Sequence, residues 1–299
     1  MQSYNQIVKL SLIKDVELIM KREDKIHPHI SGNKYRKLTY NLVSAKQQNA
    51  HTLLTFGGAY SNHISATASA GMEFGFKTIG VIRGDELEDR IVDNPTLTFA
   101  QQCGMQFKFV SRELYRKKSE PEFLASLKNE FGDFYCLPEG GTNELAIKGC
   151  EEILTEQDAV FDYVCVPVGT GGTIAGLINS AKDHQKVIGF PALKGNFLQD
   201  EIKTFTTKNN WKLITDYHFG GYGKINSELI TFINQFKDET GIPLDPIYTG
   251  KMLFGIVDLI RKDYFKKGSK IIAVHTGGLQ GIQGMNKKLQ QKGLRTIIE

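Results

Sequence analysis

The stretch that decides the fold is Ser31-Gly32-Asn33-Lys34-Tyr35-Arg36-Lys37-Leu38. It follows an apolar run, 16–20, and a charged turn, and it leads into a helical pattern over about 33–48. Gly32 and Asn33 suit a corner between a strand and a helix, with Asn33 predicted as the N-cap. Lys34 then falls in the first helical turn, where the macrodipole disfavours a cation. On these eight residues alone a lysine extending into solvent is the better interpretation, and the rest of the chain reverses it.

Strand-like runs alternate with helix-like stretches along almost the whole chain. The expected strands cover 52–56, 77–82, 106–110, 134–138, 161–168, 186–190 and 271–274, and longer helical stretches include 62–74, 112–131 and 144–157. The 161–168 strand is almost continuously apolar, as expected of a strand buried on both faces. The alternation predicts an α/β fold with open, twisted, mostly parallel sheets and helices on both faces.

Three of these strands end in corners that contain glycine, at 57–58, 169–172 and 277–278. Ligands of open parallel sheets bind beyond the carboxyl ends of the strands. Thr170, Gly171, Gly172 and Thr173 form the clearest anion site, because glycines expose backbone N–H groups at a helix N-terminus. Ile174 stands where a dinucleotide fingerprint needs glycine, and the Walker lysine is absent. A turn required only for tight packing is the alternative.

Other candidate ligand groups lie next to such corners. Ser61, Asn62 and His63 open a helix after 57–58, and they can hold a carboxylate or phenolate oxygen. Alternatively Ser61 or Asn62 caps its own helix, and His63 is a structural or exposed histidine. Tyr222 and Tyr248 each stand beside glycines, where a hydroxyl can reach a ligand; half-buried tyrosines with satisfied hydroxyls are the alternative.

Composition limits the remaining possibilities. The 299 residues suffice for one large or two modest domains. A net charge of +4 without a basic block gives no support to nucleic-acid binding. The four cysteines contain no CxxC pair, so neither a zinc site nor thioredoxin-like chemistry is indicated, and free thiols fit a reducing cytosol. No signal peptide or apolar run of membrane length is found, so we expect a cytoplasmic protein without a membrane partner.

Taken together, the motifs resemble pyridoxal-phosphate enzymes of the tryptophan-synthase β-like fold. Within that fold the chain is similar to the D-cysteine desulfhydrase / 1-aminocyclopropane-1-carboxylate (ACC) deaminase family. The resemblance covers nearly the whole chain, and its segments keep the family's order. The matching segments are 21–24, Gly32-Asn33-Lys34, Arg36-Lys37-Leu38, Ser61-Asn62-His63, Thr170-Gly171-Gly172-Thr173, 244–251 and 275–278.

The resemblance implies a role for each candidate residue. Lys34 would be the Schiff-base lysine of pyridoxal 5'-phosphate, and a catalytic residue. Asn62 would bond the cofactor's phenolic oxygen, and 170–173 would hold its phosphate. The substrate carboxylate would lie on Ser61, Asn62 and His63, and Ser61 would be a further catalytic candidate. Tyr222 and Tyr248 would flank the substrate as candidate proton-transfer groups, and Thr249 and Thr276 would also contact the cofactor. No metal is expected.

It also implies an organisation in two domains. The large cofactor-binding domain would comprise 1–47 and 156–299, and the small domain would be the insertion 48–155. The cofactor would lie in the cleft between them. A homodimer is the oligomer expected of the family, and the partner molecule would be a small amino-acid substrate.

Two threonines bear on the substrate. ACC deaminases of this family carry Glu beside the pyridine nitrogen and Leu before the final Gly-Gly, where this chain has Thr249 and Thr276, as in D-cysteine desulfhydrases. A threonine supplies no negative charge to keep the pyridine nitrogen protonated, and a weaker electron sink suits elimination of a good leaving group. Tyr60 stands where members of the family usually have Gln before Ser-Asn, a difference expected to alter the entrance to the site.

The prediction is therefore a lyase that converts D-cysteine or a relative to pyruvate, ammonia and sulfide. ACC deamination, elimination from D-serine or a β-chloro amino acid, and racemisation remain alternatives. A non-catalytic protein that binds cofactor or amino acid is an alternative of another class. A nucleotide-binding oxidoreductase is disfavoured by Ile174.

Overall fold

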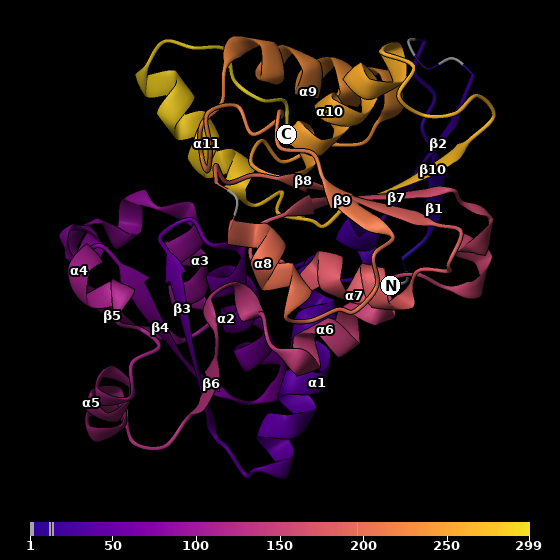
Figure 1. The fold of residues 1–299 in the computed structure, drawn as a ribbon. Coiled ribbons are helices and arrows are strands. Elements are labelled where there is room, and N and C mark those ends of the chain that lie inside the picture. The colour runs from indigo at the N-terminus through magenta and orange to yellow at the C-terminus, as the bar shows by residue number, and fades with distance from the viewer. Residues whose placement is uncertain (1–2, 12, 14, 196) are drawn as a thin grey trace.

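Two separate sheets organise the chain in the computed structural model, which describes residues 3–11, 13, 15–195 and 197–299 (Figure 1). Among those residues the strands form a six-stranded sheet in the order β1-β2-β10-β7-β8-β9 and a four-stranded sheet in the order β5-β4-β3-β6. The strands are β1 Asn5–Ile7, β2 Glu17–Lys21, β3 Thr52–Gly58, β4 Lys77–Arg83, β5 Met105–Val110, β6 Tyr135–Leu137, β7 Tyr163–Val168, β8 Lys186–Pro191, β9 Trp211–Leu213 and β10 Lys270–Val274. The helices are α1 Asn33–Gln47, α2 Asn62–Phe74, α3 Pro95–Gln102, α4 Arg112–Arg116, α5 Pro121–Phe131, α6 Glu144–Glu151, α7 Gly172–Ser180, α8 Phe197–Lys203, α9 Ser227–Thr240, α10 Thr249–Arg261 and α11 Gly281–Gln291.

The six-stranded sheet is parallel except at one edge, where β1 runs antiparallel to β2. β10 lies between β2 and β7, and Ile272 is in register with Ile19 on one side and Val164 on the other. All three side chains are buried, because helices cover both faces: α9 and α10 lie on one side, and α6 and α7 on the other (Figure 1). A strand covered on both sides needs apolar residues at consecutive positions, which explains the apolar run in β7.

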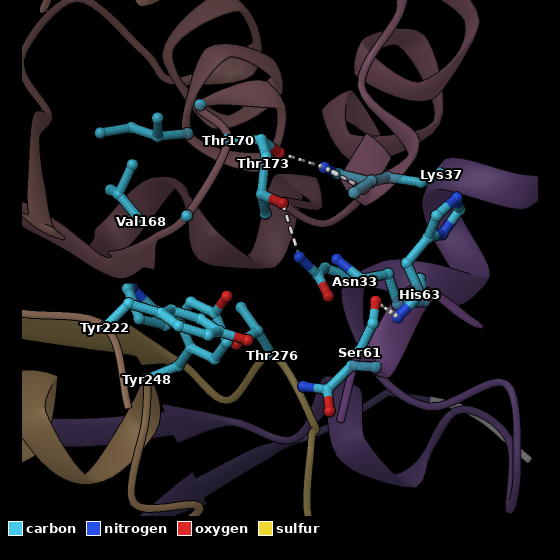
Figure 2. A pocket seen from close by; sticks show the side chains of 17 residues that line it. Asn33, Lys37, Ser61, His63, Val168, Thr170, Thr173, Tyr222, Tyr248 and Thr276 are labelled. Carbon is cyan, nitrogen blue, oxygen red and sulfur yellow. Dashed lines mark hydrogen bonds between the residues drawn. The ribbon is translucent and has the colours of Figure 1, made fainter. Parts of the chain in front are cut away.

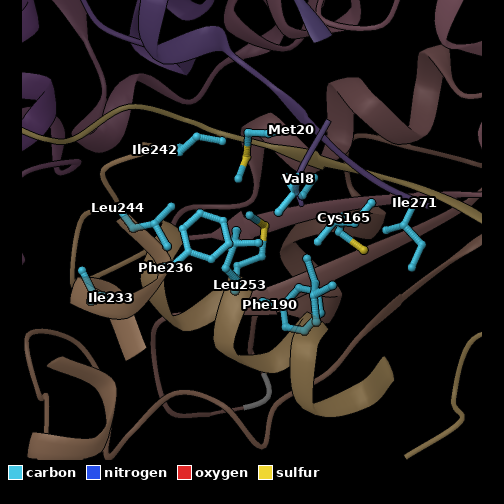
Figure 3. Packing of buried hydrophobic residues seen from close by; sticks show 14 of the residues in the cluster. Val8, Met20, Cys165, Phe190, Ile233, Phe236, Ile242, Leu244, Leu253 and Ile271 are labelled. Carbon is cyan, nitrogen blue, oxygen red and sulfur yellow. The ribbon is translucent and has the colours of Figure 1, made fainter. Parts of the chain in front are cut away.

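The largest apolar cluster lies between this sheet and α9 and α10. Phe236 and Leu253 from those helices pack against Cys165 and Phe190 from the strands (Figure 3). The Cys165 thiol is buried here as an apolar group, and burial raises its pKa well above the usual range. This core fixes α10 on the sheet, and α10 begins directly after Tyr248.

The four-stranded sheet comes from the middle of the chain and is entirely parallel. Leu54, Phe56, Ile79 and Val81 face a cluster that includes residues of α4 and α5. Leu53 and Ile82, at alternate positions, face the side of α2 and its neighbours. The period of two explains why both faces of β3 and β4 are apolar.

The predicted α/β class and the parallel sheets are confirmed, and three local expectations are wrong. Gly32, not Asn33, is the N-cap of α1, and it makes no side-chain capping bond. The expected helix over 112–131 is two helices, because Pro121 starts α5 and disfavours helical backbone just before it. The expected helix over 144–157 ends at Glu151, since Thr155 and Asp158 form a capping box that starts a new turn.

The four-stranded sheet falls within 48–155, whereas α6, from the same range, packs on α1 and α7. The division into domains at 48–155 stays a prediction.

Candidate active site

One cavity collects most of the candidate residues. It opens where α1, α2 and α7 begin, beside the ends of β7 and β10. Figure 2 shows side chains from these elements pointing into a common space. Of the predicted residues, those that line it are Lys34, Ser61, Asn62, His63, Thr170, Gly171, Thr173, Tyr222, Tyr248 and Thr276. Gly172 follows Gly171 as the first residue of α7.

Lys34 reaches this cavity because the corner before it is unusually tight. Gly32 has φ +61, and a Cβ there would lie 2.0 Å from the Thr276 carbonyl oxygen, so only glycine fits. The Asn33 amide donates to the same carbonyl at 3.3 Å. Part of Lys34 faces the cavity; burial, and secondly the nearby Lys37 ammonium, lower its pKa well below the usual range. A lysine with such a pKa is available as a neutral, nucleophilic amine.

Lys37 is the second lysine of the site, and its side chain is almost fully buried. Its Nζ donates to the Gly140 carbonyl at 3.0 Å and to Thr142 Oγ1 at 2.9 Å, and it lies 3.5 Å from Thr170 Oγ1. Burial lowers its pKa to about 8. None of these partners is an acid, so an anion at this point would supply the missing counter-charge.

The loop before α7 lies beside that ammonium. Thr170 Oγ1 is 2.6 Å from Thr142 Oγ1, and Thr173 Oγ1 accepts from Asn33 Nδ2 at 2.7 Å (Figure 2). Gly171 has φ +83, which turns the backbone into the helix. The first N–H groups of a helix have no acceptor within it, so those of α7 are free for an anion.

His63 contributes a buried imidazole ring to the cavity. Within the described part of the chain, neither of its ring nitrogens has a hydrogen-bond partner. Its pKa is held well below the usual value by burial and then by the charges of Lys34 and Lys37. The ring is therefore neutral, and it retains one donor and one acceptor for a ligand.

Ser61 and Asn62 stand at the start of α2. Ser61 Oγ accepts from the His63 and Ile64 amides at 3.2 and 3.3 Å, so it is an N-cap while still lining the cavity. Asn62 Oδ1 accepts from Gln280 Nε2 at 2.5 Å. The oxygen of this carboxamide is thus engaged, and its two N–H donors are left for other partners.

The two tyrosines lie together at the cavity. The rings of Tyr222 and Tyr248 are 6.2 Å apart in an edge-on arrangement (Figure 2). Burial raises the pKa of both phenols; for Tyr248, Tyr222 and Asp245 add to the effect. Both phenols are therefore protonated near neutral pH and can act as proton donors.

Thr249, Thr276 and Tyr60 occupy different surroundings. Thr276 lines the cavity, but Thr249 does not. Thr249 Oγ1 donates to Asp245 Oδ1 at 2.7 Å and accepts from the Asp245 amide at 2.9 Å, so its single proton is already committed. Tyr60 lies outside the cavity lining: its ring is 4.0 Å from Lys288 Nζ, on α11.

Comparison with known proteins identifies the family. The sequence profile described as pyridoxal-phosphate dependent enzyme matches residues 4–277. The chain belongs to this family of pyridoxal-phosphate-dependent enzymes. A bifunctional D-cysteine desulfhydrase/ACC deaminase of Arabidopsis thaliana is 32% identical over 295 residues, covering 89% of this chain and 73% of that protein. An ACC deaminase of Rhizobium rhizogenes is 31% identical, covering 90% and 89%. A crystal structure of an ACC deaminase homologue superposes with a TM-score of 0.82 at 30% identity, covering 97% and 94%.

The predicted family, fold and cofactor are thereby confirmed, and the cavity of this pyridoxal-phosphate enzyme fits its cofactor. Lys34 and Lys37 both line it, and none of its 17 lining residues, all in the described ranges, is acidic. A phosphate between Lys37 and the start of α7 would complete the charge balance. The described residues contain no group of three or more His, Cys, Asp or Glu side chains able to hold a metal. In the same residues, no helix has the length and apolarity to cross a membrane.

Sequence reasoning missed three polar groups of the site, those of Asn33, Lys37 and Thr142. Lys37 follows Lys34 by three residues, which places both on one face of α1. Thr142 follows Gly140-Gly141, a fourth glycine corner, which is separated from the end of β6 by two residues. The rule that ligands bind at glycine corners beyond the carboxyl ends of parallel strands also applies to this corner.

Proposed function

We propose that this enzyme is a lyase of the D-cysteine desulfhydrase type. It would take up D-cysteine and one water and release pyruvate, ammonia and hydrogen sulfide. When bound, pyridoxal phosphate supplies an electron-withdrawing ring in conjugation with the substrate nitrogen. The residues of this chain then have to bind the cofactor, orient the substrate and move protons.

Binding of the cofactor is assigned to two places on α1 and to the first residues of α2 and α7. Lys34 would hold the aldehyde carbon, because its low pKa leaves an unprotonated amine. Lys37, Thr170 and Thr173, with the amides of Gly171 and Gly172, would hold the phosphate. Asn62 would donate to the phenolic oxygen, since its Oδ1 is already engaged by Gln280.

The substrate carboxylate is assigned to the start of α2. The Asn62 carboxamide N–H groups and the unpartnered His63 ring supply donors there, and the positive end of the helix macrodipole favours an anion. A carboxylate fixed at that place presents its α-carbon toward Lys34, which lines the same cavity. Once the substrate amine has replaced it, Lys34 would take the α-proton.

The leaving sulfur requires a proton donor or a polar wall on the opposite side. Tyr222 and Tyr248 are protonated there, because burial raises the pKa of both phenols. Either hydroxyl would donate to the departing thiolate. Since a thiolate is a stable anion, this step requires less assistance than opening a cyclopropane ring does.

The hydroxyl of Thr276 in the cavity wall is the observation that supports D-cysteine over ACC. Thr249 lies outside the cavity lining, so its part in the choice of substrate rests on the family resemblance alone. ACC deamination is the second candidate, because relatives at about 30% identity carry that name.

A substrate panel tests the proposal. The purified, cofactor-loaded protein is incubated with D-cysteine, L-cysteine, D-serine and ACC, and keto acid and sulfide are measured. We expect sulfide and pyruvate from D-cysteine and little keto acid from ACC. Keto acid from ACC without sulfide from D-cysteine would overturn the assignment.

The remaining expectations concern organisation. We retain a homodimer, a cytoplasmic location and a small domain at 48–155 as predictions. Light scattering of the purified protein tests the first, and limited proteolysis with mapping of the fragments tests the last.

A further inference from the structure

Lys251 is a buried lysine that the proposed reaction does not use. It lies on α10, three residues after Tyr248, and only 2% of its surface is exposed. Its Nζ donates to the His218 carbonyl and to the Gly221 carbonyl, at 2.9 Å each. A buried ammonium is costly unless it is hydrogen-bonded, so this pair of bonds is a specific arrangement.

Both carbonyls belong to the loop that carries Tyr222. The Gly221 amide donates to the His218 carbonyl at 3.0 Å, and the Lys224 amide donates to the Gly221 carbonyl at 3.2 Å. Lys251 therefore binds the acceptor of each of two successive turns, which share Gly221. The loop also contains Phe219 at φ +53, a conformation that a non-glycine residue rarely adopts. Such a loop requires contacts from outside to hold one shape.

α10 provides those contacts along one face. Phe254 packs edge-on against Phe219 at 5.0 Å, and Asp258 accepts from the Tyr217 hydroxyl at 2.6 Å. Positions 251, 254 and 258 follow the helical repeat, so they form one row. Lys251 is the member of this row that reaches the turn next to Tyr222.

We propose that Lys251 is a positioning residue for Tyr222. It ties the Tyr222 loop to the helix that begins after Tyr248, and so fixes the two rings relative to each other. Tyr222 needs such a device because 47% of its surface is exposed, which leaves its ring less restrained by packing. The inference rests on the proposed function for the part played by Tyr222, but the tether itself is independent of the substrate.

A double-mutant cycle on the cofactor-loaded enzyme tests the catalytic part. Lys251→Met keeps the length of the side chain and removes its donors. We expect it to lower kcat for D-cysteine about tenfold, with little change in the Kd for pyridoxal phosphate. In a Tyr222→Phe background the same change should have little further effect, because the positioned hydroxyl is already gone. Lys266→Met, which removes an exposed lysine, is the control and should leave kcat unchanged.

Deuterium exchange of the segment 217–224 tests the tether without substrate. Lys251→Met should speed exchange there, while the segments of β7 and α7 keep their protection. Lys251→Gln, which retains a shorter donor, should give a smaller change and serves where the methionine variant fails to fold. Equal losses of kcat with Tyr or Phe at 222, or unchanged exchange in 217–224, would overturn the proposal. If the wild type were inactive on every substrate of the panel, the lyase assignment would be refuted. Deuterium exchange of 217–224 would then still test whether Lys251 holds the Tyr222 loop in place.

Discussion

Lys37 Nζ lies 2.9 Å from Thr142 Oγ1, although the two residues are 105 positions apart in the sequence. The contact joins the start of α1 to the loop after β6, and Thr170 lies beside it. A buried cation surrounded by a carbonyl and hydroxyls is ready for a second, anionic partner. The proposed phosphate site therefore draws on three separate segments, and its parts can be tested one at a time.

The first prediction uses inorganic phosphate on the cofactor-free protein. Phosphate should raise the melting temperature of the wild type, because binding to the native state stabilises it. Lys37→Met should weaken phosphate binding about tenfold or more, since a hydrogen bond to a charged group contributes about 1.5–3 kcal/mol. Lys203→Met removes an exposed cation on α8 and should keep the wild-type response. Equal responses of the two variants would count against the site.

The second prediction is that Lys34, not Lys37, carries the cofactor. Borohydride reduction of the loaded protein, followed by peptide mapping, should place the label on Lys34. The physical reason is that burial and the Lys37 charge lower the pKa of Lys34 well below its usual range, whereas that of Lys37 falls only to about 8. In Lys37→Met the label should remain on Lys34. Label on Lys37, or on no lysine, would end the assignment.

The third prediction concerns the loop before α7. Gly171→Leu should lower cofactor retention, because a bulky residue disturbs a backbone held at φ +83. Gly104→Leu is the matched control: φ is +84 there, and no other atom lies within 4 Å of the added Cβ. Both variants introduce backbone strain at a positive φ, but only Gly171→Leu should release pyridoxal phosphate in dialysis. Normal retention by a folded Gly171→Leu would show that the loop does not hold the phosphate.

The fourth prediction concerns pH and the cofactor-free protein. The pKa of Lys37 is about 8 in the folded state and 10.5 ordinarily, so between these values the unfolded chain holds more protons. The free energy of unfolding should therefore rise with pH across this window through Lys37. Denaturant unfolding at pH 8 and pH 10 should show a smaller rise for Lys37→Met than for the wild type. Parallel changes in the two proteins would mean that Lys37 is not a perturbed group.

The sequence was sufficient for the fold class and for the residues that end strands. A parallel strand buried on both faces, such as β7, has a continuous apolar run that the sequence shows directly. Ligand sites lie where the carboxyl ends of several such strands meet, so the site could be placed from the strands. Lys37 and Asn33 were missed because their hydrogen-bond partners come from segments far apart in the chain, which a local sequence pattern does not show. Thr142 was missed although its glycine corner, Gly140-Gly141, is a local signal. Asn33 also shows the limit of capping rules: the corner is closed by the Thr276 carbonyl, which frees the Asn33 side chain to donate to Thr173.

The last prediction concerns substrate choice at Thr249 and Thr276. Thr276→Leu replaces a hydroxyl in the cavity wall by an apolar group. Thr249 lies outside the lining, next to the lining residue Tyr248, and Thr249→Glu adds a longer side chain whose carboxylate would pair with a protonated pyridine nitrogen. Together they should shift the ratio of the two kcat/KM values from D-cysteine toward ACC, and this ratio compares transition-state binding of two substrates on one protein.

The structure adds a condition to this experiment. Thr249 is bonded to Asp245, whose carboxylate accepts from the amides of Ile247, Tyr248 and Thr249. A second carboxylate at 249 would lie beside this one in a buried place, so Thr249→Glu should lower the melting temperature, and Thr276→Leu should not. The single Thr276→Leu variant therefore tests the wall alone, and it should lose part of its D-cysteine activity while remaining stable. If neither Thr276→Leu nor the double variant changes the ratio in a folded, cofactor-loaded protein, the two threonines do not set the substrate, and the residues around Tyr222 become the determinants to test.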